Sequence, residues 1–261
     1  MAKYGGGGGG GSGAGHTVSV DNADTTSDFL ANKLVAGTSI ALTVLNPGGN
    51  EQLRIDLITA FAITSFAKVG GNLVLAGASV VNPSFTAAYN QAATAVSLTD
   101  SEGHNDVIAL PGNAFVSPHT FTKTVYGSTV TFTDHGTGPS GTGSATANTT
   151  LSWGQNVFFG SAVDPGGGGY NNAFITGLGS VLKLAPAGTY AYNASALQSC
   201  FFCARSAFGL TPANFTEGGF PFACSLVAAG VAVTNANGVV ENYDVFRSDN
   251  IGLGAFNLVE A

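Results

Sequence analysis

The feature that most constrains the fold is an alternation of apolar and polar or small residues with a period of two. Residues 39–57 read SIALTVL, then NPGGN, then EQLRIDL, and the alternating apolar positions are Ile40, Leu42, Val44, Leu53, Ile55 and Leu57. A period of two places successive side chains on opposite faces of a strand, and the Pro- and Gly-rich run between them is typical of a turn. The pattern predicts a β-hairpin.

Similar short runs continue through residues 61–152. Segments rich in β-branched and aromatic residues alternate there with turn signals, at intervals of about 8–12 residues. This spacing and the length of the region are typical of an immunoglobulin-like β-sandwich, although the Cys and Trp pattern of antibody domains is absent. Within this region, Phe121 and Phe132 flank a YGS turn and are expected to lie on the two strands of a hairpin.

Residues 153–261 contain strand-like runs of their own and predict a second β-sandwich. Asn237-Gly238 predicts a hairpin with a type I′ turn, in which both central residues have positive φ. Residues 172–184 are the one plausible helix, and their glycines weaken it. The expected architecture is all-β and modular, with a Gly-rich flexible arm (1–15), a small N-terminal β-hairpin module (16–60), an Ig-like β-sandwich (61–152) and a C-terminal β-sandwich (153–261).

The composition limits the classes of partner. Hydrophobic residues make up 44% of the chain and charged residues only 9%, with a formal net charge of −7. Negative charge repels phosphate backbones and anionic lipid, so we expect no nucleic acid and no membrane among the partners. No apolar run reaches the roughly 18 residues of a membrane span, and polyglycine occupies the place of a signal peptide.

No motif predicts a catalytic, cofactor or metal site. The glycine tract at residues 5–11 lacks the Lys-Ser/Thr of a phosphate loop. Cys200 and Cys203 have the spacing of a metal or redox site, but no second pair follows them. Buried core thiols are expected, and a disulfide from Cys224 to one of the pair is the alternative. The acidic run at residues 100–106 predicts a solvated hairpin loop rather than a calcium site.

The remaining polar and aromatic candidates are dispersed. His16, His119 and His135 are scattered, and no hydrolase motif accompanies them. Two carboxylates that meet in the fold could form a glycosidase pair, but the chain has few acids. Five aromatic residues lie beside Gly, Asn and Ser, as in recognition loops on which sugar rings stack, and are candidates for ligand binding: Tyr170, Tyr190, Tyr192, Phe220 and Phe222. The alternative is that these rings belong to the core.

Three segments resemble virion proteins of tailed bacteriophages, in particular tail-fibre and minor structural proteins. The first is DNADTTSDFLANKLVAGTSIALTVLNPGGNEQLRID, residues 21–56, which carries DTT, the KLVAGT turn and the GGNEQLRI strand. It departs from the pattern at Ser27-Asp28, where Pro-Gly is common. The second is SFTAAYNQAATAVSLTDSEGHNDVIALP, residues 84–111. The third comprises EGGFPFACSLV and VTNANGVVENYDVFRSDNIGLG, in which Pro221 and Phe222 replace a more usual acidic residue.

The resemblance implies a structural, non-enzymatic tail fibre-like protein that attaches to the host surface. A head fibre or capsid decoration protein is the first alternative, and a glycan depolymerase is the second, although no internal β-helix repeat is found. The resemblance also implies a homotrimer, contacts with other virion proteins and with a host surface glycan or protein, and a virion location after synthesis in the host cytoplasm. The arm, with Tyr4, Gly5 and Gly11, is expected to anchor the protein in the virion.

Overall fold

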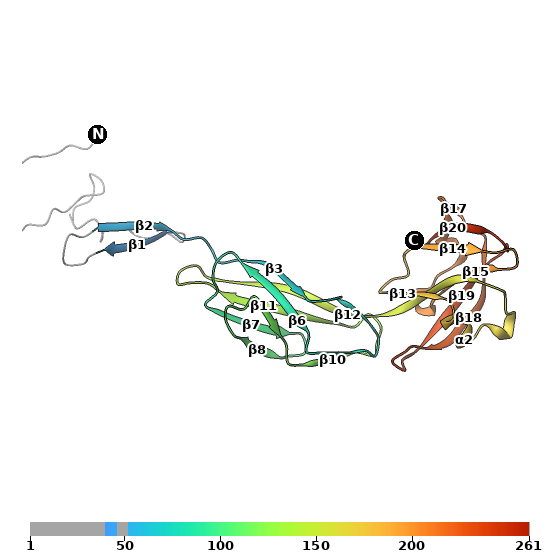
Figure 1. Cartoon of the computed structure of the whole chain (residues 1–261), viewed down its shortest axis with the longest axis horizontal. Coiled ribbons are helices and arrows are strands. Elements are labelled where there is room, and N and C mark those ends of the chain that lie inside the picture. Colours follow the sequence, from blue (N-terminus) through green and yellow to red (C-terminus); the bar gives the residue numbers. More distant parts are fainter. Residues whose placement is uncertain (1–39, 46–51, 261) are drawn as a thin grey trace, which may run out of the picture.

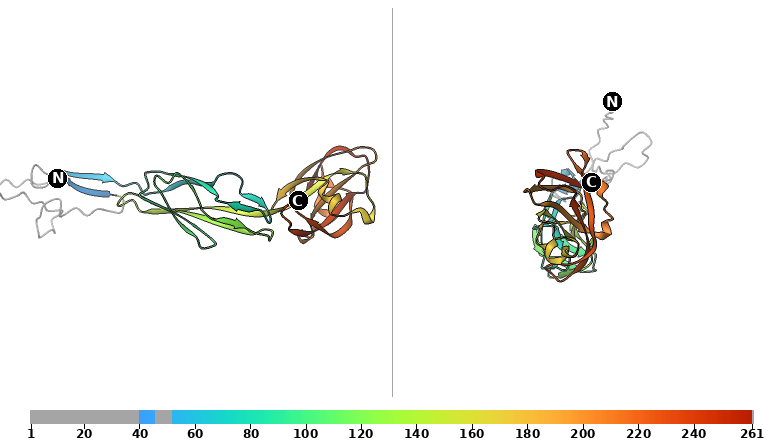
Figure 2. Two further views of the ribbon diagram at one scale, coloured as in Figure 1. Left: turned by 60° about the horizontal axis from the view of Figure 1, so that its bottom comes forward. Right: turned by 90° about the vertical axis from the view of Figure 1, so that its right-hand side faces the viewer.

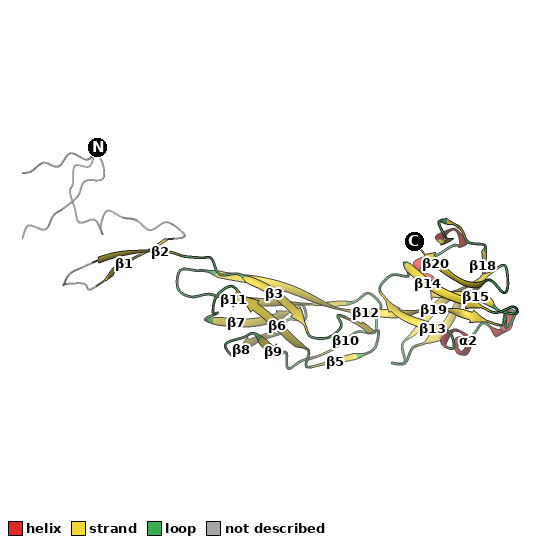
Figure 3. Ribbon diagram, turned by 45° about the horizontal axis from the view of Figure 1, so that its top comes forward, coloured by secondary structure: helices red, strands yellow, loops and turns green. Residues whose placement is uncertain are grey.

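The computed structural model describes residues 40–45 and 52–260. The chain is all-β and modular, with a hairpin, a central sandwich and a C-terminal sandwich following one another along one axis (Figures 1 and 2). Strands dominate, and the helical segments are short and lie in the C-terminal sandwich (Figure 3). No helix among the described residues is long and apolar enough to span a membrane. The predicted arm, with Tyr4, Gly5 and Gly11, lies outside the described residues, as do His16 and the NPGGN turn.

The predicted hairpin at the start of the described chain is confirmed. Strand β1 (Ile40–Leu45) pairs antiparallel with β2 (Gln52–Leu57), and Leu42 lies opposite Ile55. The hairpin projects beyond the end of the central sandwich (Figures 1 and 2).

Two sheets form the central sandwich. One contains β3 (Ile63–Lys68), β6 (Ser84–Tyr89) and β9 (Ala114–Val116); the other contains β7 (Ala95–Asp100), β8 (Asn105–Ile108), β11 (Thr129–Thr137), the first half of β12 (Ser144–Ala162) and β4 (Leu73–Leu75). Apolar positions alternate along these strands and meet in one core, in which Phe85, Phe132 and Trp153 are almost completely buried. A small ladder of β5 (Ser79–Val81) and β10 (Thr120–Thr122) lies beside them.

The hairpin predicted around the YGS turn is wrong. Phe121 and Phe132 are both buried, but β10 pairs with β5, whereas β11 pairs with β7 and β12. Trp153 separates the two strands at the turn, because its carbonyl accepts from Gly127 N (2.8 Å) and its N–H donates to Ser128 O (3.0 Å). The turn therefore passes from one ladder to another.

Strand β12 belongs to both sandwiches. Its first part pairs with β11 as far as Ser152, and its last part pairs with β13 (Gly179–Lys183) and β15 (Ser199–Arg205) from Gln155 onward. The strand is 19 residues long and runs without a break through position 153, where the sequence analysis places a domain boundary. A single nine-stranded sheet therefore extends from one sandwich into the other.

The C-terminal sandwich has three layers. A sheet of β18 (Cys224–Thr234), β19 (Val240–Ser248), β15, β13 and the end of β12 packs against a second sheet of β14 (Gly188–Ala194), β20 (Gly254–Glu260), β16 (Phe215–Glu217) and β17 (Phe220–Pro221). The short helix α2 (Asn172–Thr176) and the loop before it cover the other face of the first sheet. Strand β15 is covered on both faces, so its residues from Ser199 to Ala204 are all buried.

Two local predictions for this sandwich need correction. The helix expected over residues 172–184 ends at Thr176, and residues 179–183 form β13, because two glycines, Gly177 and Gly179, interrupt the helix. The hairpin at Asn237-Gly238 joins β18 to β19, but only Gly238 has positive φ. Asn235 makes the turn one residue longer, because its Oδ1 accepts from the backbone N–H of Asn237 (2.9 Å) and Val239 (3.1 Å).

The tip of this β18–β19 hairpin reaches the central sandwich. The side-chain Nδ2 atoms of Asn235 and Asn237 donate to the carbonyl oxygen of Ala76, at 2.8 and 3.2 Å. Gly77 has a φ of +85°, and a Cβ atom there would lie 2.7 Å from the Val239 side chain. Glycine at this position therefore permits the close approach of the two sandwiches.

A second contact across the joint centres on Arg205. Its guanidinium carbon lies 4.1 Å from the ring centroid of Tyr126, which belongs to the central sandwich. The same guanidinium donates to Glu241 Oε2 from Nε (3.1 Å) and Nη2 (2.9 Å). Phe208 packs edge-on against the Tyr126 ring at 5.5 Å. With the shared strand, these contacts make the joint a packed interface rather than a linker.

Candidate functional site

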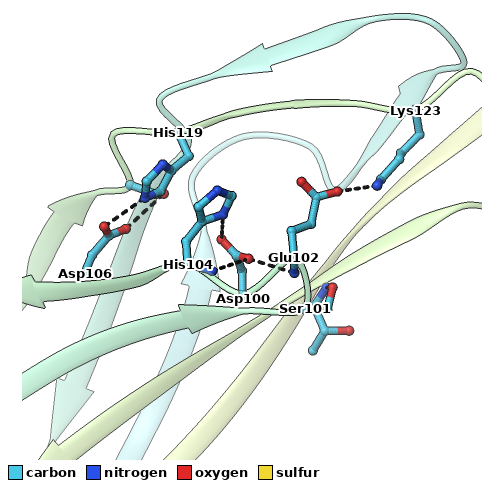
Figure 4. A network of polar contacts seen from close by, with 9 residues as sticks. Asp100, Ser101, Glu102, His104, Asp106, His119 and Lys123 are labelled. Carbon is cyan, nitrogen blue, oxygen red and sulfur yellow. Dashed lines mark hydrogen bonds and ion pairs between the residues drawn. The ribbon is translucent and has the colours of Figure 1, made fainter.

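The acidic run between β7 and β8 forms a polar network with residues from farther along the chain (Figure 4). Asp100 ends β7, and its Oδ2 lies 2.8 Å from His104 Nδ1, while its Oδ1 accepts from the backbone N–H groups of Glu102 (2.8 Å) and His104 (3.3 Å). Asp106 on β8 contacts His119 Nε2 at 3.0 Å. Ser101, Glu102 and Gly103 at the tip are exposed, which confirms the predicted solvated hairpin loop. Only 3% of the Asp100 side chain, at the base of this loop, is exposed.

The two histidines of this network stack on each other. The rings of His104 and His119 have centroids 3.8 Å apart and are inclined by 16°, and Phe121 meets both rings edge-on. His119, which the sequence groups with the scattered histidines, thus has a partner in His104, because the connection from β9 to β10 returns it to the β7–β8 turn. His135 lies elsewhere and contacts Thr99 Oγ1 at 2.9 Å. The spacing of His104 and His119 along the sequence gives no signal that their rings stack.

This network contains a serine but not in a catalytic order. Ser117 Oγ donates to Asp106 Oδ2 at 3.2 Å, and Asp106 contacts His119 on its other oxygen. A Ser-His-Asp triad needs the histidine in the middle, where it takes the serine proton. Here the carboxylate is in the middle, and Ser117 is completely buried. Across the described ranges, no group of three or more His, Cys, Asp or Glu residues is arranged to hold a metal ion.

The network instead holds the turn in place. The carboxylate of Asp100 caps backbone N–H groups in the manner of an Asx turn, and Glu102 forms an ion pair with Lys123 from the segment after β10. We therefore assign these contacts to the stability of this end of the sandwich.

The five predicted aromatic residues differ in their burial. Four are buried: Tyr170, Tyr190, Tyr192 and Phe222. Their polar atoms have partners inside the sandwich; Tyr192 Oη, for example, donates to Phe201 O (2.9 Å) and Tyr170 Oη donates to Asp164 Oδ1 (2.5 Å). Tyr190 and Tyr192 belong to the core because alternation along β14 turns their rings toward the opposite sheet. Tyr170, in the loop before α2, and Phe222, just after β17, pack into the core from outside the strands. Tyr170 also ties down the glycine-rich loop at residues 164–170.

Phe220 is different, since 75% of its surface is exposed. It follows a two-residue turn in which Gly218 and Gly219 both have positive φ (57° and 86°), and Glu217 pairs with it across the turn. Type I′ turns require this conformation and match the twist of the strands, so the turn presents the ring on a rigid hairpin. The Gly-Gly pair between two short apolar runs is the sequence signal that could have predicted this hairpin.

A groove of about 530 Å³ lies beside the Phe220 ring. Its walls include the carboxylate-bearing Glu217, the amide-bearing Asn250 and the apolar Leu253. A volume of this size is within the range of small-molecule sites, and an aromatic ring beside a few polar groups is suited to a ligand with both apolar and hydroxyl-bearing faces. We refer to it as the Phe220 groove.

The three cysteines are buried free thiols in the C-terminal sandwich. Cys200 and Cys224 belong to the core between the two sheets, whereas Cys203 faces the layer that contains helix α2. The expected buried core thiols are confirmed, and Cys224 forms no disulfide with either member of the pair. Burial raises the pKa of the Cys224 thiol to about 11 and also raises the pKa values of the other two, which suppresses their reactivity.

Comparisons with known proteins found no matching family model, no significantly similar curated protein and no significantly similar solved structure.

Proposed function

We propose that the chain is a structural, fibre-like component of a tailed-bacteriophage virion that contacts the host surface through its C-terminal sandwich. The observation that carries this proposal is strand β12, which continues from one sandwich into the next. A strand shared by two domains resists bending at the joint, because bending would break ladder hydrogen bonds on both sides. An elongated, stiff molecule suits a part that holds a binding surface away from a particle.

The joint supports the same interpretation. The hairpin tip at Asn235 and Asn237 is hydrogen-bonded to the central sandwich, and Arg205 stacks on Tyr126 across the boundary. Domain pairs joined only by a linker move freely relative to each other, whereas these contacts favour one orientation. In the proposed virion, the hairpin end is directed toward the particle and the Phe220 groove toward the host.

The location is tested by labelling intact particles with an antibody against the C-terminal sandwich and viewing them by electron microscopy. Label at the end of the tail is the expected result. Label over the capsid would replace the tail-fibre assignment by a head fibre or decoration protein. Unlabelled particles, together with absence of the chain from purified virions by mass spectrometry, would overturn the proposal.

We assign the host contact to the Phe220 groove, with a carbohydrate as ligand. A sugar ring has apolar C–H faces that stack on an aromatic ring, and its hydroxyl groups can bond to Glu217 and Asn250. The test measures binding of the purified chain to host cells and to polysaccharide purified from them. Phe220→Ser should weaken binding at least tenfold, whereas Val107→Ser, an exposed apolar position on β8 of the other sandwich, should not.

If Phe220→Ser binds as tightly as Val107→Ser and the wild-type chain, the assignment of the host contact to the Phe220 groove is refuted. The same polysaccharide, analysed for new reducing ends after incubation with the chain, tests for depolymerase activity. An increase in reducing ends would replace the structural role by an enzymatic one.

A further inference from the structure

The hairpin of β1 and β2 has one face made of aliphatic side chains alone. Three cross-strand pairs form this face: Ile40 with Leu57, Leu42 with Ile55, and Val44 with Leu53. Four of the six are substantially exposed: Ile40 (41%), Val44 (43%), Ile55 (61%) and Leu57 (80%). None of the six belongs to a core cluster of the described chain. We call this surface the aliphatic face.

The described part of the chain cannot cover the aliphatic face. The segment after β2 is held on the central sandwich, where Gln91 Nε2 donates to Thr59 O (2.8 Å) and Asn90 Nδ2 donates to Ala60 O (2.8 Å). Phe61 is buried, and its N–H donates to Thr142 O at 2.8 Å. The hairpin therefore points away from the sandwich, as Figures 1 and 2 show. Because a two-stranded hairpin alone is at best marginally stable in water, we expect another surface to cover the aliphatic face.

The charges on the hairpin indicate which kind of partner this is. The opposite face carries Arg54 and Asp56, and these two pair with each other at 2.6 Å between Nε and Oδ2. The aliphatic face itself carries no charged or hydrogen-bonding side chain. A partner must therefore offer a flat, uncharged aliphatic surface of the same length, and the same face of a second copy meets this requirement.

The exposed area of the aliphatic face gives the size of a contact between copies. A buried Val, Leu or Ile side chain removes about 100 Å² of apolar surface from water, and the exposed fractions on this face amount to between two and three such side chains. Each copy would therefore bury somewhat less than about 300 Å² of apolar surface. Because apolar atoms make up about two-thirds of a homo-oligomeric interface, the total buried surface is about 400 Å² per copy. Two copies then bury about 800 Å² between them, the size of a crystal contact. Three copies bury about 1,200 Å² in total, divided over three contacts.

We propose that the aliphatic face is an interface between copies of this chain, in which three hairpins close around a common apolar core. The number of copies in this inference rests on the homotrimer that the resemblance to tail-fibre proteins implies, and hence on the proposed function. The structure assigns the surface that holds the copies together. The sandwiches can then project from the bundled hairpins, with each Phe220 groove left accessible.

The test compares the masses of full-length variants in solution by analytical ultracentrifugation. The wild-type chain should sediment as a trimer. Ile55→Glu, which places a charge on the aliphatic face, should weaken association at least 100-fold and yield a monomer. Thr43→Glu, on the opposite face of the same hairpin, should remain a trimer. Both positions are exposed, so the unfolding of the sandwiches should be unchanged in each variant.

A cross-linking measurement provides a second, independent readout. Leu57→Cys on the aliphatic face should form disulfides between copies under mild oxidation, whereas Arg54→Cys on the opposite face should not.

The outcomes separate the two proposals. If Ile55→Glu remains a trimer, or Leu57→Cys forms no cross-link in a trimeric protein, the aliphatic face is not the interface, although the trimer stands. If the wild-type chain is a monomer at micromolar concentration, the inference and the trimer both fail. In that case residues 16–38 of the same chain are the next candidate to cover the face, and labelling of particles still decides the virion location.

Discussion

Replacement of Arg205 by Met should destabilise the joint between the two sandwiches. Met retains much of the aliphatic stem but removes the guanidinium from the Tyr126 ring and from Glu241. The Arg205 and Glu241 side chains are only 14% and 21% exposed, so their ion pair is less screened than a surface pair.

The expected magnitude follows from these contacts. A cation–π contact of this kind is worth about 0.5–2 kcal/mol. Loss of the two charge-assisted hydrogen bonds, which also leaves Glu241 partly buried without its partner, costs about 1.5–3 kcal/mol. We therefore expect Arg205→Met to lower the free energy of unfolding by about 2–5 kcal/mol.

Trp153 makes this change directly measurable. It is the one tryptophan of the chain, is completely buried, and donates from Nε1 to Ala78 O (2.9 Å) where β12 passes between the sandwiches. Urea unfolding followed by its fluorescence therefore reports on the joint. A double-mutant cycle of Arg205→Met with Tyr126→Leu should give a coupling energy of about 0.5–1.5 kcal/mol across the joint.

The control for this cycle is Tyr126→Phe. The Tyr126 hydroxyl is buried and has no hydrogen-bond partner among the described residues, so its removal should leave the stability unchanged or slightly higher. A coupling energy near zero between Arg205 and Tyr126 would refute the argument that this contact holds the sandwiches together, even if Arg205→Met is destabilising through Glu241.

Two further predictions concern buried ionisable groups. The thiols of Cys200, Cys203 and Cys224, whose pKa values are raised by burial, should resist Ellman's reagent at pH 8 until urea is added; rapid reaction of the folded chain would contradict their burial. Burial also raises the pKa of Asp134 above its ordinary 3.8, so above that pH the folded chain binds more protons than the unfolded chain and loses stability as pH rises. Asp134→Asn should therefore have a higher urea midpoint than the wild-type chain at pH 7, but not below about pH 3.8. Equal midpoints for the variant and the wild-type chain at every pH would disprove this reasoning.

Local sequence patterns predicted where the strands lie better than which strands pair with each other. Alternation identified β1 and β2 because each side-chain face of an exposed hairpin is encoded within a few residues. The same reasoning misplaced β10 and β11, because two adjacent strands joined by a tight turn usually pair with each other. Here the backbone of Trp153, 21 residues beyond Phe132, occupies the position where that ladder would form.

The candidate sites show the same division. The sequence marked five aromatic residues by their neighbours, but neighbours along the chain do not reveal which rings a second layer covers, and four of the five are core residues. Only Phe220 is presented outward, on a turn whose Gly-Gly pair is a local signal. The stacked pair of His104 and His119 had no local signal, since a return of the chain brings them together.

By itself, the sequence determined that the chain is all-β, where most strands lie, and that its surface carries few charges, because alternation, turn residues and composition are local properties. Only the tertiary structure decided which strands pair, that β12 serves both sandwiches, which cysteines share a core, and that the aliphatic face of the first hairpin lacks cover within the described chain. These features depend on contacts between residues far apart in sequence, whose pairing is set by the packing of whole layers rather than by any short segment.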